Sequence, residues 1–358
     1  MTSTAWQLGC PITLGDNADR VTLAHGEGGR LMRQLIEEHI LPRFSGSEAS
    51  IAPPDAALLQ QIEHDLVFTI DSFVVSPLFF PGGDIGQLSV IGTVNDLAVA
   101  GAQPLWISLS LIIEEGLPIP VLDCILDSAA AAARETGVRI VAGDTKVVPS
   151  STADGLFITT SGIGRALAPT PLGPETLEPG DELIVTGPIG RHGIAILVAR
   201  EQLGLTPPPE TDCTSLIDPV KQLRDAGLLA VTNNVVRAMR DATRGGVTAV
   251  FHEWAQACGH TLSILEPAIP VTPDVRGAAE LLGLDPLHIA CEGTMVVAVK
   301  SGSGDEVVEA LRKSHVSQQA TVIGVVKKRG VSPVTTQRTL GQELPLDEPS
   351  GAMLPRIC

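Results

Sequence analysis

The stretch from Gly86 to Ala102 constrains the fold most, because apolar residues surround Asn95 and Asp96 on nearly every side of the helix that it would form. Such a helix must be buried, and an ionised aspartate is costly to bury without a partner. Either Asp96 pairs with an arginine or is capped by backbone groups, or it holds a metal ion or a ligand. We favour the second explanation, so the stretch predicts a buried helix that carries a functional carboxylate.

Length and composition indicate two domains with aliphatic cores. The chain has 358 residues, more than one domain of ordinary size. Hydrophobic residues make up 44% of the sequence but aromatic residues only 3%, so Ala, Val, Leu and Ile must fill the cores. Strand-like and helix-like stretches are mixed in both halves of the chain, which indicates an α+β protein.

The charge and cysteine patterns exclude several classes of function. The 41 acidic and 24 basic residues give a net charge of −17, which disfavours binding to nucleic acids or anionic membranes. The six cysteines show no CxxC spacing, so we expect neither a disulfide framework nor a structural zinc site. The sequence has no run of 18 apolar residues, and its start lacks the basic and apolar regions of a signal peptide. We therefore expect a cytoplasmic protein.

Two strand-like stretches in the first half also carry acidic residues. Residues 65–71 alternate in polarity and end in Asp71, before a loop rich in proline and glycine. In residues 139–148, Asp144 and Lys146 are two apart, so on a strand they point to the same face. The pair suits a metal ligand beside a phosphate-binding lysine, or an exposed ion pair, and the sequence leaves both open.

Glycine-rich turns precede several predicted helices. Gly26, Gly28 and Gly29 come before the helix-like residues 31–40, and the backbone N–H groups of such a turn can bind an anion. Glu27 in the same turn would repel a phosphate unless a metal ion lies between them. An ordinary turn at the start of a helix is the simpler alternative.

The second half contains two further candidate positions. The turn 241–246 precedes a helix-like stretch, and Asp241 or Thr243 could cap that helix. Arg244, next to free N–H groups at the helix start, would favour a phosphate. Glu292 stands next to a glycine at the entrance of a strand, where it is either a turn residue or an acid of the site.

Residues 341–358 combine prolines and acidic residues without helical or strand periodicity, which predicts a flexible tail. The last residue of the sequence, Cys358, is a potential nucleophile. Fully extended, the roughly 14 residues from Pro345 could span about 45 Å, enough to reach a pocket in the same chain or in a partner. Acids, a lysine and glycine turns together fit chemistry with Mg²⁺ and nucleotide phosphate.

Seven motifs together resemble the HypE family of hydrogenase maturation factors, which are carbamoyl dehydratases of the aminoimidazole ribonucleotide synthetase-like superfamily. The motifs follow the order of that family from about residue 21 onward. They are FPGGDIG (80–86), GTVNDLAVAGA (92–102), IIEEGLP (112–118), IVAGDTKVV (140–148), DATRGG (241–246), ACEGT (290–294) and PRIC (355–358).

The resemblance implies an α+β chain with two α/β domains and a homodimer formed through the N-terminal domains. The expected divisions are a leader (1–20), an N-terminal domain for ATP binding and dimerisation (21–172), a C-terminal α/β domain (173–340) and the flexible tail (341–358). The sequence departs from the family pattern at Glu27, where a small residue is usual, and in its longer leader.

The resemblance also implies the chemistry. The partner HypF would load a carbamoyl group onto Cys358, ATP would phosphorylate its oxygen, and loss of phosphate would leave a thiocyanate whose cyanide passes to iron on the HypC–HypD complex. ATP and Mg²⁺ are the implied cofactors, with Asp71, Asp96 and Asp144 as metal ligands. Besides Cys358, Glu292 and Lys146 are the implied catalytic residues, as candidates for removing the proton from the carbamoyl nitrogen. The implied ATP-binding residues are Gly26, Gly28, Gly29, Asn95, Asp144, Thr145, Asp241, Thr243 and Arg244.

Two alternatives to this activity stay open from the sequence. One is another ATP-dependent enzyme of the superfamily, such as a selenophosphate synthetase, although those carry their reactive residue near the N-terminus. The other is a non-enzymatic scaffold that uses its tail as a docking peptide, and it predicts no turnover of ATP.

Overall fold

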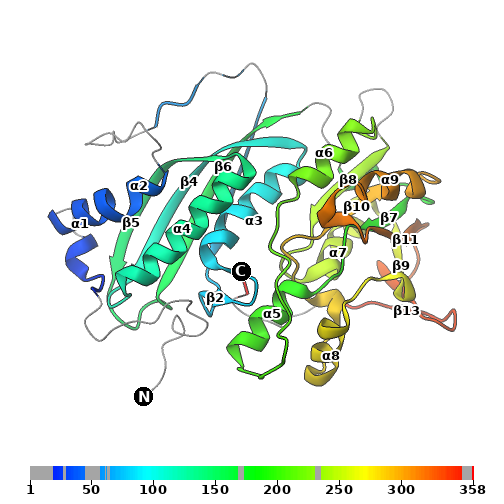
Figure 1. The fold of residues 1–358 in the computed structure, drawn as a ribbon. Helices are drawn as coiled ribbons and strands as arrows, with labels where there is room; N and C mark the ends of the chain where they lie inside the picture. The colour runs from blue at the N-terminus through cyan, green and yellow to red at the C-terminus, as the bar shows by residue number, and fades with distance from the viewer. Residues whose placement is uncertain are drawn as a thin grey trace.

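Two β-sheets, one in each half of the chain, organise the computed structural model (Figure 1). The structure describes residues 19–26, 30–44, 57–60, 62, 65–167, 173–229, 235–348 and 357–358. Most of the predicted leader, together with Glu27, Gly28 and Gly29, lies outside these described residues. None of the helices in the described ranges has the length and apolar character needed to cross a lipid bilayer.

The first sheet has four strands in the order β1-β6-β4-β5. Only the β4–β5 pair is parallel. The strands are β1 (Leu66–Phe73), β4 (Ala102–Glu114), β5 (Arg139–Val148) and β6 (Leu156–Ala166). Helices α3 (Ile85–Val99) and α4 (Ile119–Thr136) pack together over one face of this sheet (Figure 1). The short N-terminal elements near β5 are η2 (Leu23–Gly26), α1 (Arg30–Leu35), the π-helical turn η3 (Ile36–Ile40) and α2 (Leu41–Phe44), and a small β2–β3 hairpin (Phe79–Phe80, Gly83–Asp84) precedes α3.

Helix α3 confirms the predicted buried helix. The Asp84 side chain caps it by accepting hydrogen bonds from the backbone N–H groups of Gly86 and Gln87. Nearly every residue from Ile85 to Val99 is buried, because the sheet and α4 lie on one side of α3 and elements of the second domain on the other. Helix α4 is rich in alanine and ends at Gly137 in the left-handed conformation (φ 74°) that glycine tolerates.

The second sheet has seven strands in the order β13-β12-β9-β11-β7-β10-β8. The strands are β7 (Glu182–Val185), β8 (Val236–Asp241), β9 (Thr261–Leu265), β10 (Met295–Val299), β11 (Thr321–Lys327), β12 (Val334–Gln337) and β13 (Glu343–Pro345). The helices are α5 (Arg191–Arg200), α6 (Ile217–Asp225), α7 (Gly246–Cys258), α8 (Pro273–Leu282) and α9 (Gly304–Leu311). Short 3₁₀ turns are η5 (Pro174–Thr176), η6 (Glu266–Ala268), η7 (Pro286–His288) and η8 (His315–Ser317).

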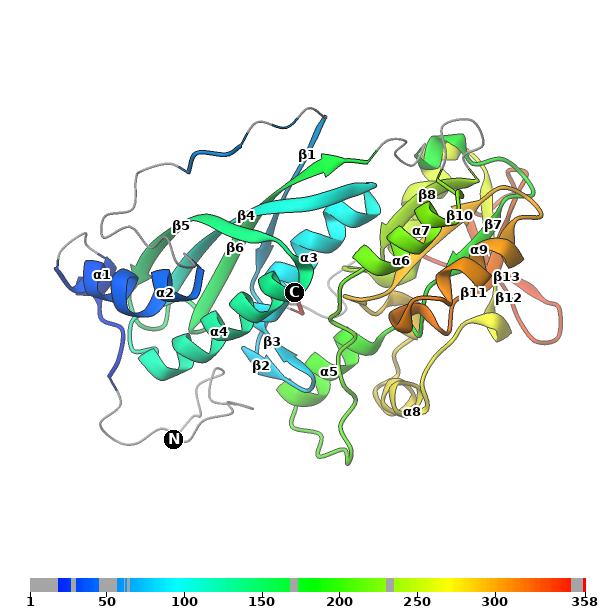
Figure 2. The ribbon, with the colours of Figure 1, turned by 45° about the horizontal axis from the view of Figure 1, so that its top comes forward.

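The two sheets differ in how their faces are covered. In the second sheet, α7 packs on one face and α6 and α9 on the other, so every residue of β10, which lies between β7 and β8, is buried (Figure 2). In the first sheet the helices cover one face only. The other face exposes the large apolar side chains of Leu66, Phe68 and Ile70 on β1 and Ile112 on β4. A sheet that leaves apolar side chains in water on one face is typical of an interface with another molecule.

The domains also share a core, because later parts of the chain pack against the first domain. Ile196 of α5, Cys213, Ala290 and Ile357 belong to the same buried cluster as the helices α3 and α4. Both views place the last residue of the chain close to β2 and α5, at the junction of the domains (Figures 1 and 2).

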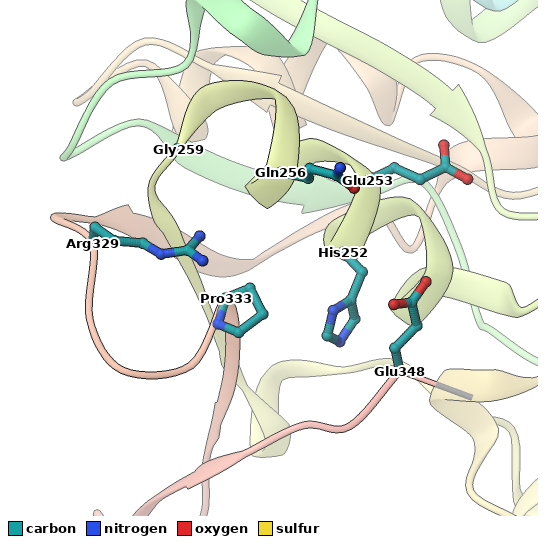
Figure 3. A pocket seen from close by; sticks show the side chains of 7 residues that line it. All are labelled: His252, Glu253, Gln256, Gly259, Arg329, Pro333 and Glu348. Carbon is teal, nitrogen blue, oxygen red and sulfur yellow. The ribbon is translucent and has the colours of Figure 1, made fainter. Parts of the chain in front are cut away.

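The prediction that the tail lacks regular structure from residue 341 is wrong for its first part. Strand β13 pairs with β12 in an antiparallel hairpin. Leu346 follows it with 9% exposure, packs in the core of the second sheet, and its carbonyl oxygen lies 2.9 Å from Nε2 of His252. Figure 3 shows His252 and Glu348 on the wall of a cavity near Leu346, and this cavity has a volume of about 390 Å³. Backbone pairing with a sheet edge does not need the alternating apolar pattern that the prediction required.

Candidate active site

Cys358 is held against its own chain. Its carbonyl oxygen accepts a hydrogen bond of 3.2 Å from the backbone N–H of Val74, which follows β1. The preceding residue, Ile357, is only 5% exposed and packs in the first core. Its carbonyl oxygen lies 2.6 Å from Nε2 of His192 on α5. The sequence left open whether the tail reaches a pocket in its own chain or in a partner, and the structure shows it in its own.

Four carboxyl groups from separate elements converge beside this thiol. Asp71 comes from β1, Asp96 from α3, Asp241 from the end of β8, and Glu292 from the loop that enters β10. Each of the four is among the charges that shift the pKa of Glu292 or of the Cys358 thiol. The packing of α3 against both β1 and β8 explains why residues so distant in sequence meet here.

Burial dominates the protonation behaviour of this acid cluster. It raises the pKa of Glu292 well above its usual range, and the charges of Asp241 and Asp212 raise it further. The pKa of Asp241 rises to about 7, first through burial and then through the charge of Asp96. Burial also raises the pKa values of Asp71 and Asp96. Buried like charges repel one another, so a cation among these oxygens would relieve the cost.

The Cys358 thiol shares this environment. Burial raises its pKa well above the ordinary range of a cysteine, and the negative charge of Glu292 raises it further. The charge of Arg244 opposes this rise, and its Nη2 lies 3.9 Å from Oδ1 of Asp71. The docked thiol is therefore protonated near neutral pH and is a poor nucleophile while it stays in the site.

Glu292 has the clearest signature of a reactive group. Its side chain is 2% exposed, and its Oε1 atom is buried without a hydrogen-bond partner among the described residues. Native structures pair nearly all buried polar atoms, so an unpaired one indicates a role in catalysis or ligand binding. The loop that carries Glu292 is fixed by Asp212, whose carboxylate accepts hydrogen bonds from the backbone N–H groups of Glu292 (3.0 Å) and Gly293 (3.2 Å) and from the Thr294 hydroxyl (3.1 Å).

Asp212 is a residue that the sequence analysis missed. It is 7% exposed and follows a proline-rich linker without strand or helix periodicity, so no pattern marked it. Its role depends on the position of a loop about 80 residues later in the chain, which only the folded structure supplies.

Asn95 has a different role from the one predicted. Its amide nitrogen donates to the carbonyl oxygens of Glu292 (2.8 Å) and Thr214 (3.0 Å), and its oxygen accepts from the N–H of Leu216 (2.8 Å). The residue is 1% exposed. Asn95 thus joins α3 to the second domain, and its polar atoms are used by backbone groups rather than offered to a nucleotide.

Asp96, the next residue of this helix, is half-buried, and its Oδ2 accepts a hydrogen bond of 2.7 Å from the Thr69 hydroxyl on β1. Neither an arginine pair nor a backbone cap satisfies it within hydrogen-bond distance in the described residues. This leaves the metal or ligand explanation as the one that the geometry favours.

The predicted pair on β5 lies apart from the acid cluster. Lys146 Nζ and Asp144 Oδ1 are 3.5 Å apart, and both side chains are more than half exposed. They share the open sheet face with Ile112 and Ser110 of β4, whereas Thr145 between them is buried toward the helices. Because β1 and β5 are the two edges of a four-stranded sheet, Asp144 is three strand spacings, about 14 Å, from Asp71. Within one chain the predicted metal set of Asp71, Asp96 and Asp144 does not converge.

The glycine turn lies next to this pair. Gly26 packs so closely against β5 that a Cβ atom there would be 2.8 Å from the backbone nitrogen of Val147, which explains why a glycine is needed. In the other predicted turn, neither Asp241 nor Thr243 caps α7, since no side-chain hydrogen bond is made at its start and Gly245 occupies the N-cap. The capping predictions for these two residues are wrong.

The two α/β domains place this chain among the AIR synthase related proteins. The model of the N-terminal domain of this class matches residues 53–166, and that of the C-terminal domain matches residues 178–336. This confirms the expected α+β fold.

Within this class, the chain belongs to the HypE family of carbamoyl dehydratases. It is 44% identical to carbamoyl dehydratase HypE of Escherichia coli K12 over 95% of this chain and 100% of that protein. A crystal structure of hydrogenase maturation protein HypE in complex with ATP matches with a TM-score of 0.85 and 36% identity, over 94% of this chain and 99% of the other. A crystal structure of a HypE–HypF complex matches with a TM-score of 0.74 and 40% identity, over 79% and 90%.

Proposed function

We propose that this protein dehydrates an S-carbamoyl group on Cys358 to a thiocyanate, with ATP as the phosphate donor. The observation that carries the proposal is the position of Cys358, whose thiol is docked beside the unpaired carboxyl group of Glu292. The name of the relatives and the ATP bound to one of them support the same activity.

The reaction has two chemical steps. In the first, the carbamoyl oxygen attacks the γ-phosphorus of ATP, ADP leaves, and the nitrogen loses one of its two protons, which gives an O-phosphorylated imidate. In the second, the carbamoyl nitrogen loses its remaining proton, the C–N bond becomes triple, and phosphate leaves from carbon. An amide oxygen is a poor leaving group, and its phosphorylation makes elimination possible.

Glu292 is the base that the geometry favours for the second step. Burial raises its pKa, and a carboxylate of raised pKa is a stronger base at neutral pH. Asp212 fixes the backbone of the loop that carries Glu292, which helps to position the carboxyl group. Lys146, the other candidate, is exposed on another face of its own chain.

The acid cluster fits a divalent cation. Its oxygens are hard ligands, and the raised pKa values of Asp96 and Asp241 support a site that added positive charge would stabilise. Asp71 and Asp96 would hold Mg²⁺, which when bound would neutralise charge on the phosphates of ATP. Arg244, at the start of α7, would contact the same phosphates.

A homodimer would complete the site. The open face of the first sheet carries Leu66, Phe68, Ile70 and Ile112 in water, and Asp144 and Lys146 lie on that same face. Pairing of two such faces would bury the apolar row and enclose Asp144 and Lys146 at the interface. In this arrangement Lys146 and Asp144, with Thr145 and Gly26 behind them, would contribute to the nucleotide site of the assembled dimer.

HypF is the proposed source of the carbamoyl group, because a related chain has been crystallised with it. The proposed acceptor of the cyanide is iron on the HypC–HypD complex. The docked thiol is half-buried, and its raised pKa keeps it protonated, so loading and transfer both require Cys358 to leave the site.

Mass spectrometry of the tail peptide tests the proposed function. The parent chain is incubated with HypF, carbamoyl phosphate and Mg²⁺·ATP, and we expect a carbamoyl adduct on Cys358 that then loses one water. The control removes ATP once the carbamoyl group has been loaded, and the reaction should then stop at the carbamoyl adduct. An adduct on another cysteine, or release of ADP without loss of water, would contradict the proposal.

A further inference from the structure

Residues 211–213 connect to both reactive groups of the site. The Asp212 carboxylate holds the loop of Glu292. The hydroxyl of the neighbouring Thr211 lies 2.8 Å from Nδ1 of His192, whose Nε2 is 2.6 Å from the carbonyl oxygen of Ile357. The same three-residue loop therefore contacts both the loop that carries Glu292 and the histidine that bonds the tail.

The hydrogen bonds fix the tautomer of His192. A carbonyl oxygen can only accept, so Nε2 must carry a hydrogen and donate it to Ile357. Burial lowers the pKa of the fully buried His192, so the ring is neutral and Nδ1 is a bare acceptor for the Thr211 hydroxyl. Thr211 Oγ1 in turn accepts from the backbone N–H of Cys213 (3.1 Å). Every donor in this series has an acceptor.

The surroundings of His192 are rigid. Its ring meets Phe80 edge-on, with centroids 5.5 Å apart. At the other end of α5, Nε of Arg200 donates to the carbonyl oxygen of Ser76 (2.8 Å), in the loop that follows Val74. Val74 donates its own N–H to the Cys358 carbonyl. Two main-chain carbonyls of the tail, at consecutive residues, are thus held by elements that are tied to one another.

We propose that His192 is a positioning residue, which docks the tail through the Ile357 carbonyl and so places the Cys358 sulfur against Glu292. His192 bonds a main-chain oxygen of the tail and not the cysteine side chain. The same contact can therefore form with the free thiol, the carbamoyl form and the cyano form of Cys358. The proposal rests on the proposed function for the reaction itself, but docking can be measured without it.

Alkylation of the free thiol measures docking directly. Full-length protein is treated with iodoacetamide, and labelling of Cys358 is followed by peptide mass spectrometry, with half-buried Cys258 on α7 as the internal reference. His192→Phe keeps the ring volume and removes the donor, whereas His192→Gln keeps an N–H donor of similar reach. A hydrogen bond of this kind typically changes an equilibrium about 2- to 10-fold. We expect Cys358 of His192→Phe to label about 2 to 10 times faster than the parent, His192→Gln to stay within about twofold, and Cys258 to be unchanged.

Single-turnover kinetics provide the second readout. On chains already carrying the carbamoyl group, His192→Phe should slow thiocyanate formation by the same factor at saturating ATP. The KM for ATP and the extent of loading by HypF should stay at the parental level, which a merely structural defect would not leave intact. If His192→Phe does not fold, Thr211→Val, which removes the hydroxyl that bonds Nδ1 of His192, should show the same accelerated labelling.

Equal labelling of Cys358 in the parent and in His192→Phe or Thr211→Val would overturn the proposal. Equal acceleration in His192→Phe and His192→Gln would also overturn it, because packing and not the donor would then hold the tail. If the parent forms no thiocyanate but the labelling difference persists, the proposed function fails and the docking role of His192 stands.

Discussion

The acid cluster at the domain junction and the Asp144–Lys146 pair on β5 contain similar residues in opposite surroundings. In the cluster, burial raises the pKa of every carboxyl group and leaves an oxygen of Glu292 unpaired. On β5 the ion pair is more than half exposed, where solvent screening makes such pairs worth little. The difference teaches that the first region can carry chemistry within one chain, whereas the second acquires a function only if another molecule covers it.

The largest effect is expected at the thiol. Cys358→Ala should leave the fold and the binding of ATP intact and should abolish incorporation of the carbamoyl group, because the acceptor atom is missing. Mass spectrometry after incubation with HypF, carbamoyl phosphate and ATP measures the loss, and a thermal melt checks the fold. Carbamoylation of this variant at parental yield would show that the cluster serves another nucleophile.

Glu292→Gln should accept the carbamoyl group normally and accumulate it. A general base typically contributes about 10²–10⁴ in rate, so thiocyanate formation should slow by that factor. The matched control is Glu280→Gln on the exposed surface of α8, which should convert at the parental rate. Dehydration at the parental rate in Glu292→Gln would show that Glu292 is not the base. Lys146 would then be the better candidate, and the β5 pair rather than the acid cluster would carry this step.

Asp96→Asn and Asp144→Asn compare the two regions directly. Loss of a ligand for metal and phosphate charge in the cluster should reduce phosphate release by about 10²–10³ for Asp96→Asn. The effect of Asp144→Asn should be smaller, and it should vanish under conditions where the protein is monomeric. Phosphate release at saturating Mg²⁺ provides the measurement, and equal losses in both variants would show that one metal set joins the two regions.

Phe68→Glu tests whether a second copy covers β5. A charge in the apolar row of the open sheet face should favour the monomer and reduce turnover roughly 10- to 100-fold, about 1.4–2.8 kcal/mol. Leu281→Glu is the control, because Leu281 is an equally exposed apolar residue (68% against 64%) on α8 of the other domain. Light scattering reports the oligomeric state. Full activity in a monomeric Phe68→Glu variant would leave Lys146 without a role.

The smallest effect concerns acid stability. Burial lowers the pKa of His192, opposed by its bond to Ile357 and by the charge of Asp212, which is the charged group that acts on it. The unfolded chain, with an ordinary histidine pKa near 6.5, therefore binds a proton more readily than the folded one. The free energy of unfolding should fall as the pH drops below about 6.5.

The glutamine of His192→Gln cannot take up a proton in the unfolded chain. As the pH falls from 7 to 5, the Tm of His192→Gln should therefore decrease less than the Tm of the parent. A shift of roughly 2–4 °C corresponds to 1 kcal/mol for a domain of this size. Calorimetry at the two pH values gives the answer, and parallel pH profiles would show that His192 is not buried in its neutral form.

Several features of this protein could be predicted from local sequence because they depend on local forces. The apolar stretch around Asn95 and Asp96 forms the buried helix α3, as its pattern predicts. Motif order was sufficient for the family and the α+β fold. Local pattern failed where backbone pairing replaces side-chain periodicity, as in the β12–β13 hairpin at residues predicted to be flexible.

The tertiary structure decided which candidate residues work together. Asn95 and Asp96 are neighbours on one helix, yet Asn95 bonds the backbone of the second domain while Asp96 stays available to a ligand. Asp212 and His192 have no sequence signature, because their roles depend on contacts 80 and 165 residues away. Sequence determines what each element is, since propensity and burial patterns act over a few residues. The site depends on how the elements pack, and that packing alone sets the distances, the dielectric and the neighbouring charges.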